Sequence, residues 1–163
     1  MCTHHHRRDN QAVQAVKAAV AKPKMRNFRL VECEFPALAA LNKLGDGSMQ
    51  SANQVEDANL QTAVLICRAL STPLGLGPQA CLVISGSATA RLTQRARRAY
   101  SSVHSLREDG GISADEKNKV FVLVAPSGRD YQLAQQLASD GATVVLVNGF
   151  AKVSILCVNM LSH

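Results

Sequence analysis

Three short apolar runs, each followed by a small polar turn, constrain the fold of this chain most strongly. They read ACLVISGS at residues 80–87, VFVLVAPSG at residues 120–128 and ATVVLVNG at residues 142–149. Each run is rich in β-branched residues and lacks an alternation of polar and apolar positions. This pattern is typical of strands that are buried on both faces of a parallel sheet. We therefore predict that the three runs form the centre of such a sheet.

Helical patterns lie between these runs. Residues 52–70 carry apolar side chains at intervals of three and four positions, which predicts an amphipathic helix. The residues predicted to face inward are Val55, Leu60, Ala63, Val64, Cys67 and Leu70. Ser87 and Ser127 are the predicted N-caps of two later helices, because a serine hydroxyl accepts a hydrogen bond from the first helical turn. Asp130 forms a capping pair with Ser127.

Helix and strand patterns alternate along the whole chain. A helix is predicted at residues 9–22, a strand at 27–35, and a flexible loop in the polar stretch 101–118. The alternation predicts an α/β fold with a mainly parallel sheet of about four strands. Helices are expected on both faces of this sheet, as in a Rossmann-like three-layer arrangement.

The chain is long enough for one domain with a buried core, since 47% of its 163 residues are hydrophobic. We assign the α/β domain to residues 9–152. Residues 1–8 include three adjacent histidines, and we predict a disordered N-terminal end there rather than a metal site. Residues 153–163 form an apolar tail. No metal site and no cofactor are predicted.

Charge and composition narrow the classes of partner. The net charge of +6 favours an anionic partner, such as an acidic protein, an anionic lipid surface or RNA. The other interpretation is that the charge only keeps a small protein in solution. Aromatic residues make up 4% of the chain and Trp is absent, which argues against a nucleic-acid site built on base stacking. No apolar run approaches the roughly 18 residues that span a bilayer.

The cysteines indicate a reducing compartment. There are five of them, an odd number, and no two have C-x-x-C spacing. We therefore expect no disulfide framework.

The polar turns after the strands are the candidate ligand site. Ligands of open parallel sheets bind at the carboxyl ends of the strands, and helix N-termini there attract anions. The candidate contacts are Ser87, Ser127, Gly128, Arg129 and Asn148. These residues predict a pocket for a phosphate or carboxylate group. The alternative is that serine caps a helix and glycine fills a turn without any ligand.

A basic stripe is the second candidate surface. Arg91, Arg95 and Arg98 recur at intervals of four and three residues on one predicted helix. Such a stripe can bind an acidic partner, an anionic lipid or a phosphate backbone. The alternative is an ordinary solvated helix face.

The sequence contains no recognisable catalytic motif. It has no Walker lysine after a glycine loop, no nucleophile elbow and no HExxH pattern. Glu32 and Glu34 point to one face of the predicted first strand, where they are either exposed charges or an acid/base pair without a second catalytic group. The question of enzymatic activity stays open, and the pattern favours a non-enzymatic protein.

Three short motifs resemble a known family. They are ECEFP at residues 32–36, VFVLVAPS at 120–127 and VVLVN at 144–148. In this order they resemble a plastid and cyanobacterial family built on a domain of unknown function. Its members include a photosystem II assembly factor, named for low photosystem II accumulation, and the C-terminal extension of a chloroplast adenylate kinase. The resemblance covers residues 10–150.

This resemblance implies a location and a role. The location is the chloroplast, either in the stroma or peripheral to the thylakoid. The implied partners are photosystem II or thylakoid assembly proteins. The family has no established catalytic residues, so none is carried over to this chain.

Two departures from the family pattern stand out. Gly149 occupies a position where the family has proline, and the tail at residues 153–161 matches no family segment. One hypothesis for the tail is a truncated or mis-spliced gene model.

Three functions follow as hypotheses. The leading one is a soluble plastid protein that assists photosystem II accumulation through protein contacts. The second is a domain or enzyme that binds a phosphorylated small molecule at the strand ends. The third, which the composition disfavours, is RNA binding through Arg91, Arg95 and Arg98.

Overall fold

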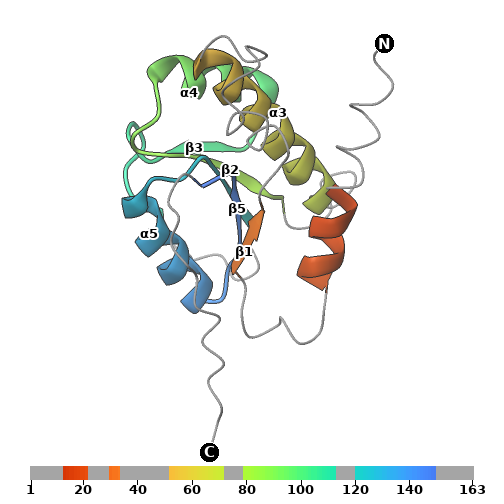
Figure 1. The fold of residues 1–163 in the computed structure, drawn as a ribbon. Coiled ribbons are helices and arrows are strands. Elements are labelled where there is room, and N and C mark those ends of the chain that lie inside the picture. The colour runs from red at the N-terminus through yellow and green to blue at the C-terminus, as the bar shows by residue number, and fades with distance from the viewer. Residues whose placement is uncertain (1–12, 22–29, 34–51, 72–78, 113–119, 150–163) are drawn as a thin grey trace, which may run out of the picture.

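The computed structural model describes residues 13–21, 30–33, 52–71, 79–112 and 120–149, and these form an α/β domain (Figure 1). A helix at residues 13–21 comes first in the described chain. The remaining elements, in chain order, are β1 (Leu30–Cys33), α3 (Ala52–Leu70), β2 (Cys81–Ile84), α4 (Ala90–Ala99), β3 (Val103–Ser105), β4 (Val120–Val124), α5 (Gly128–Ser139) and β5 (Thr143–Val147).

The five described strands form one sheet in the order β1-β5-β4-β2-β3, and every neighbouring pair is parallel. This arrangement confirms the predicted α/β fold. The prediction of a flexible loop at residues 101–118 is wrong for Val103–Ser105, which forms β3. This strand has only three residues, too few for a periodic pattern. It is stabilised by pairing with β2, where Leu82 lies opposite Val103 and Ile84 opposite Ser105.

Helices cover both faces of the sheet (Figure 1). The helix at 13–21, α3 and α4 pack on one face, and α5 packs on the other. In β4, Val122 and Val124 face α3, whereas Phe121 and Leu123 face α5. All four side chains are buried. The double burial explains why the central strands read as continuous apolar runs.

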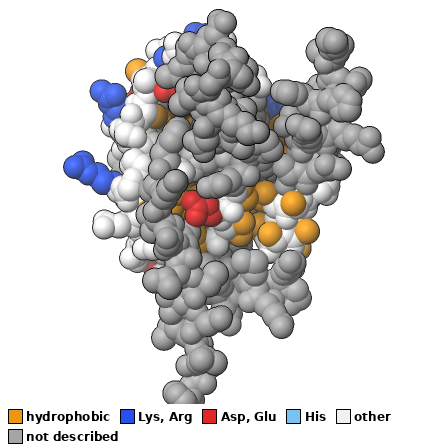
Figure 2. All heavy atoms as spheres, viewed as in Figure 1, with side chains coloured by type: hydrophobic (Ala, Val, Ile, Leu, Met, Phe, Trp, Pro, Cys, Tyr) orange, Lys and Arg blue, Asp and Glu red, His pale blue; other side chains and the backbone are white. Residues whose placement is uncertain are grey.

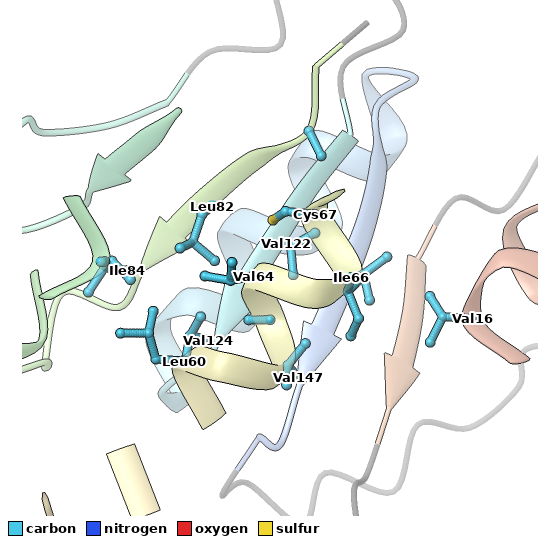
Figure 3. Close-up of a cluster of buried hydrophobic side chains, with 14 of the residues drawn as sticks. Val16, Leu60, Val64, Ile66, Cys67, Leu82, Ile84, Val122, Val124 and Val147 are labelled. Carbon is cyan, nitrogen blue, oxygen red and sulfur yellow. The ribbon is translucent and has the colours of Figure 1, made fainter. Parts of the chain in front are cut away.

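Helix α3 supplies the largest part of the first core (Figure 3). Its bounds are those expected from the periodicity, 52–70. Of the six residues predicted to face inward, Leu60, Ala63, Val64 and Cys67 are buried, and Val55 and Leu70 are half-buried. Ile66 was not among the predicted inward residues but is fully buried, in the same core cluster as Val147 (Figure 3). The apolar face of α3 is therefore wider than the periodic pattern indicated.

The start of α4 differs from the prediction. Thr89, not Ser87, is its N-cap, and the Thr89 hydroxyl accepts a hydrogen bond of 3.2 Å from the Leu92 N–H group. Ser87 lies in the preceding turn, where its N–H group donates to the hydroxyl oxygen of Ser85 at 3.2 Å. Both residue types cap helices well, so tertiary contacts decide which one does.

Several predictions fall on residues that the structure does not describe. These are the N-terminal end at 1–8, Glu34 of the first predicted strand and the tail at 153–163. Within the described part of the chain, no helix combines the length and the apolar character needed to cross a membrane.

A pair of substitutions in α3 tests its packing. Ile66→Ala is expected to lower the free energy of unfolding by about 2–5 kcal/mol, because it leaves a cavity between α3 and the sheet. The neighbouring Leu65 is 37% exposed, so Leu65→Ala is expected to change the stability by about 0.5 kcal/mol or less. Urea unfolding measures both values, and equal losses would contradict the described orientation of α3.

Candidate functional site

The centre of the sheet is a topological switch point. Strands β2 and β4 are neighbours, but the chain leaves them in opposite directions. From β2 it runs through α4 to β3, and from β4 it runs through α5 to β5, with α4 and α5 on opposite faces. In open α/β sheets, ligands bind outside the carboxyl ends of the strands at such a point. The turns at residues 85–89 and 125–127 are therefore where a ligand site is expected.

Asp130 joins these two turns. It lies in the first turn of α5 and is 6% exposed. Its Oδ2 atom accepts hydrogen bonds from the Ser85 hydroxyl at 2.5 Å, the Ser127 N–H group at 2.7 Å and the Ser127 hydroxyl at 2.7 Å. Three donors from two strand ends thus converge on one carboxylate oxygen, and we call this group of residues the Asp130 staple.

The staple confirms the predicted capping pair of Ser127 and Asp130. It also changes the electrostatics expected there. A helix N-terminus attracts anions, but at α5 the negative charge is supplied by the protein's own Asp130. A bound phosphate next to this carboxylate would be repelled. Of the three predicted contacts at this turn, Ser127 donates its hydroxyl to Asp130, whereas Gly128 and Arg129 are exposed.

Ser87 is connected to the staple through Ser85. The two hydroxyl oxygens are 2.9 Å apart. Since Ser85 donates its proton to Asp130, it accepts the hydrogen bond from Ser87. Ser87 is exposed, and Ser85 is 4% exposed. The sequence prediction located Ser87 and Ser127 but missed Ser85, the residue that links Ser87 to Asp130.

Asn148, the residue after β5, forms a hydrogen bond with a side chain of α3. It is buried, with a φ of 52°, a left-handed conformation that asparagine tolerates better than most residues. Its N–H group donates to the Cys33 carbonyl oxygen at 2.9 Å, and its Nδ2 atom donates to Oδ1 of Asn59 at 2.7 Å. Asn59 is buried in α3. This side-chain contact of Asn148 joins the end of β5 to α3.

A close contact near β1 depends on Gly149. The Tyr131 hydroxyl donates to Oε1 of Glu32 at 2.7 Å. A Cβ atom on Gly149 would lie 1.9 Å from that hydroxyl oxygen and 3.3 Å from the Glu32 oxygen. Any larger residue at this position would displace this pair. Glycine at position 149 therefore leaves room for the hydrogen bond between Tyr131 and Glu32.

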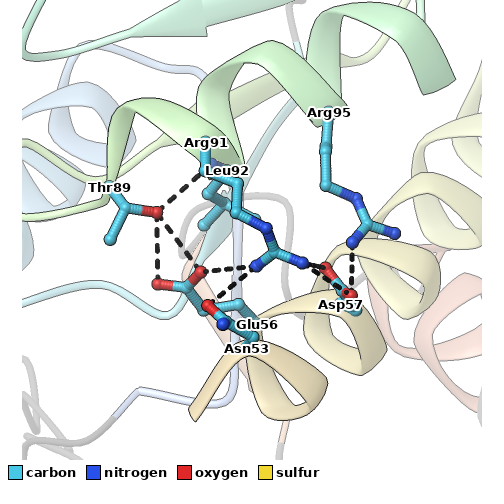
Figure 4. A network of polar contacts seen from close by, with 7 residues as sticks. All are labelled: Asn53, Glu56, Asp57, Thr89, Arg91, Leu92 and Arg95. Atoms are coloured by element: carbon cyan, nitrogen blue, oxygen red, sulfur yellow. Dashed lines mark hydrogen bonds and ion pairs between the residues drawn. The ribbon is translucent and has the colours of Figure 1, made fainter. Parts of the chain in front are cut away.

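Two arginines of the predicted basic stripe, Arg91 and Arg95, form ion pairs with a side chain of α3 (Figure 4). Arg91 donates to Oδ1 of Asn53 at 2.9 Å and to Oδ2 of Asp57 at 3.2 Å, and it lies 3.7 Å from Oε2 of Glu56. Arg95 also pairs with Asp57. These contacts tie α4 to α3, so both guanidinium groups are partly neutralised.

The last residue of the stripe, Arg98, is exposed. Arg97, which the stripe did not include, pairs with Glu108 at 2.6 Å and Asp109 at 3.1 Å.

Two of the described cysteines, Cys33 and Cys67, have a raised pKa. No disulfide joins Cys33, Cys67 and Cys81. Burial, reinforced by the nearby Glu32 charge, raises the pKa of Cys33 to about 11. Burial also raises the pKa of Cys67. Such thiols are poor nucleophiles near neutral pH, because the thiolate is the reactive form. Among the residues described here, no group of three His, Cys, Asp or Glu side chains is placed to hold a metal ion.

Comparison with known families gives a match over most of the chain. The profile of a domain of unknown function, DUF1995, matches residues 9–154. The chain belongs to this family, in agreement with its resemblance to a family built on a domain of unknown function. Searches among curated proteins and among solved structures found no significant match.

Substitution of Asp130 tests the staple. Asp130→Asn is expected to lower the free energy of unfolding by about 2–3 kcal/mol, because an amide cannot accept all three bonds and its NH₂ group opposes the donors. Asp140→Asn is the control, since Asp140 is exposed at the other end of α5 and accepts from Gln136. Urea denaturation with a fixed slope compares the two. A loss at Asp130 no larger than at Asp140 would remove the staple as a source of stability.

A double-mutant cycle tests the Gly149 contact. Gly149→Ala is expected to cost about 1–3 kcal/mol of stability, because the new methyl group overlaps the Tyr131 hydroxyl. In a Tyr131→Phe background the cost should shrink, since the overlapping oxygen is gone. Gly128→Ala is the control, because a Cβ there meets nothing within 4 Å. The cycle is measured by thermal and urea unfolding, and a cost that Tyr131→Phe leaves unchanged would refute the overlap.

Proposed function

We propose that this domain acts in the chloroplast through protein contacts, as a factor that assists the assembly or accumulation of photosystem II. Two lines of argument support the proposal. The first is the resemblance of its strand-end motifs to a plastid family that includes such a factor. The second is the hydrogen bonding of the polar groups at the switch point, where an enzyme of this architecture would place its reactive groups.

The observation that supports this proposal most directly is the Asp130 staple. Ligand binding at a switch point requires hydrogen-bond donors and helix N-termini that point toward the ligand. Here Ser85 and Ser127 donate to Asp130, and the Asp130 carboxylate occupies the start of α5. The polar groups at the strand ends therefore bond to one another. This arrangement favours a structural role for the switch point and leaves the surface to carry the function.

The surface suggests the chemistry of the partner. The chain has a net charge of +6, and Figure 2 shows Lys and Arg side chains projecting on the side of the molecule where α4 and α5 lie. Arg98 on α4 and Arg129 on α5 are both exposed, whereas Arg91 and Arg95 are engaged with α3. The basic stripe of the sequence prediction is thus reduced to Arg98, and Arg129 joins it in the proposed contact. An acidic protein surface fits these charges.

Affinity capture from thylakoid extracts tests this proposal. The full chain is used as bait beside an Arg98→Glu/Arg129→Glu variant, with photosystem II subunits quantified by immunoblot. Reversal of two exposed charges should reduce recovery severalfold, and added salt should reduce recovery by the wild type. Lys17→Glu, on the exposed side of the helix at 13–21, is the matched charge control and should recover the wild-type amount.

Recovery of photosystem II subunits that the double variant leaves unchanged would remove Arg98 and Arg129 from the contact. Failure of the wild type to recover any of these subunits above an empty-bait control would contradict the proposed role itself.

One observation supports the alternative function, in which the domain binds a phosphorylated small molecule. Arg129 is exposed in the first turn of α5, beside Gly128, where a small phosphorylated ligand would meet both a guanidinium group and helix N–H groups. A thermal-shift screen with nucleotides and sugar phosphates examines it. A saturable rise in Tm that Arg129→Ala abolishes would favour this alternative over the protein-contact function. The expected result for a stapled switch point is no rise with any of these ligands.

A further inference from the structure

Residues 106–112 follow the edge strand β3, with Leu106 beside the switch point, and we call them the strap. The strap follows β3, and its first N–H group, on Leu106, donates to the Ile84 carbonyl oxygen at the end of β2 at 3.1 Å. The Leu106 Cβ atom lies 3.8 Å from the position of a Cβ on Gly86, and Oδ1 of Asp130 lies 4.0 Å from the same position. The strap therefore lies next to the residues that form the Asp130 staple.

The apolar side chains of the strap cover the second core. Leu106 and Ile112 are both half-buried, and they pack against the cluster that contains the inner side of α5. Leu133 and Ala138 of α5 are half-buried against the same cluster. Displacement of the strap would consequently expose apolar surface at this end of the molecule.

Arg97 of α4 fastens the strap. Its Nη1 atom lies 2.6 Å from Oε2 of Glu108, and its Nη2 atom lies 3.1 and 3.2 Å from the two carboxylate oxygens of Asp109. We call these contacts the Arg97 clamp. The exposed fractions of the three side chains are 44% for Arg97, 38% for Glu108 and 36% for Asp109. Because water and ions reach all of them, the clamp is open to screening by salt.

The backbone around the clamp is held by short local bonds. The N–H groups of Glu108 and Asp109 donate to the Ser105 carbonyl oxygen at 3.2 and 2.8 Å, and the Ser105 N–H group donates to Oδ2 of Asp109 at 2.8 Å. Gly110 follows with a φ of 83°, and a Cβ there would meet nothing within 4 Å. A glycine with positive φ in open space is suited to act as the turning point of a moving segment.

We propose that the strap is a salt-sensitive cover beside the carboxyl end of β2 and over the α5 side of the sheet, held closed by the Arg97 clamp. At low ionic strength the clamp keeps Leu106 beside Gly86 and seals the apolar side of α5. Screening of the clamp lets residues 106–112 open locally while the sheet stays folded. The inference rests on the geometry of this end of the sheet and stands apart from the proposed photosystem II role.

Ionic strength, rather than carboxylate protonation, is the effective variable. The hydrogen bond from the Ser105 backbone, followed by the Arg97 charge, lowers the pKa of Asp109. A lowered pKa means that the contribution of Asp109 is present above its unfolded pKa and is lost only as the pH falls through the lower folded value. The Nε2 atom of His104 lies 3.0 Å from the Gly110 carbonyl oxygen, and the test is made at one fixed pH.

Amide hydrogen exchange of the full chain, followed by NMR, tests the cover. The strap is reported by the amides of Leu106 and Asp109, and the folded sheet is reported by Val122 of β4. At low salt, Arg97→Ala should speed exchange of the two strap amides roughly fivefold and leave Val122 unchanged. Arg98→Ala, the adjacent exposed arginine, is the control and should leave all three rates at the wild-type value.

Salt provides the second measurement. Raising the salt to about 0.5 M should speed exchange of the strap amides in the wild type but not in Arg97→Ala, whose clamp is already absent. The proposal is overturned if Leu106 and Asp109 exchange only as fast as Val122 under all conditions, since the strap then opens only when the whole domain unfolds. It is equally overturned if Arg97→Ala leaves the strap amides at the wild-type rate.

Discussion

The arrangement of this domain depends on one buried carboxylate. Asp130 is 6% exposed, and a charge at such a depth is tolerated only where hydrogen-bond donors replace water. The donors come from Ser85 after β2 and Ser127 after β4, and the N-terminus of α5 adds a favourable field. Strands β2 and β4 send the chain to opposite sides of the sheet. The staple therefore holds the structure together at the point where its connections diverge.

Much of the fold could be predicted from the sequence, and the reason lies in double burial. A central strand such as β4 is apolar at every position because Phe121 and Val122 face different helices. This continuous apolar run can be recognised in the sequence of the strand itself, without knowledge of the strands that pair with it. Strand β3 gave no such signal, because Val103–Ser105 becomes a strand only by pairing with the edge of β2. The cap of α4 was misplaced for a related reason, since Ser87 bonds to Ser85 and leaves the cap to Thr89.

The candidate site could be located from the sequence but not assembled from it. The rule that ligands meet strand ends led to Ser87, Ser127 and Asn148, and all three do follow strands. The contacts that connect these turns to the rest of the molecule were missed because they join residues distant in sequence: Ser85 and Asp130 are 45 positions apart, and Asn148 and Asn59 are 89 apart. Helical spacing likewise placed the arginines of α4 on one face, but no local pattern shows that α3 offers them carboxylates.

Two electrostatic contacts at the same end of the sheet differ in their access to water, and this difference separates their roles. The Asp130 staple is buried, so salt screens it little, and it fixes the ends of β2 and β4. The Arg97 clamp is more than a third exposed, so its strength follows the ionic surroundings. A catalytic site at a switch point needs its outward polar groups fixed and directed at a substrate. Here the fixed groups face inward and the adjustable contact lies outside, an arrangement that suits a surface whose shape changes when a charged partner approaches.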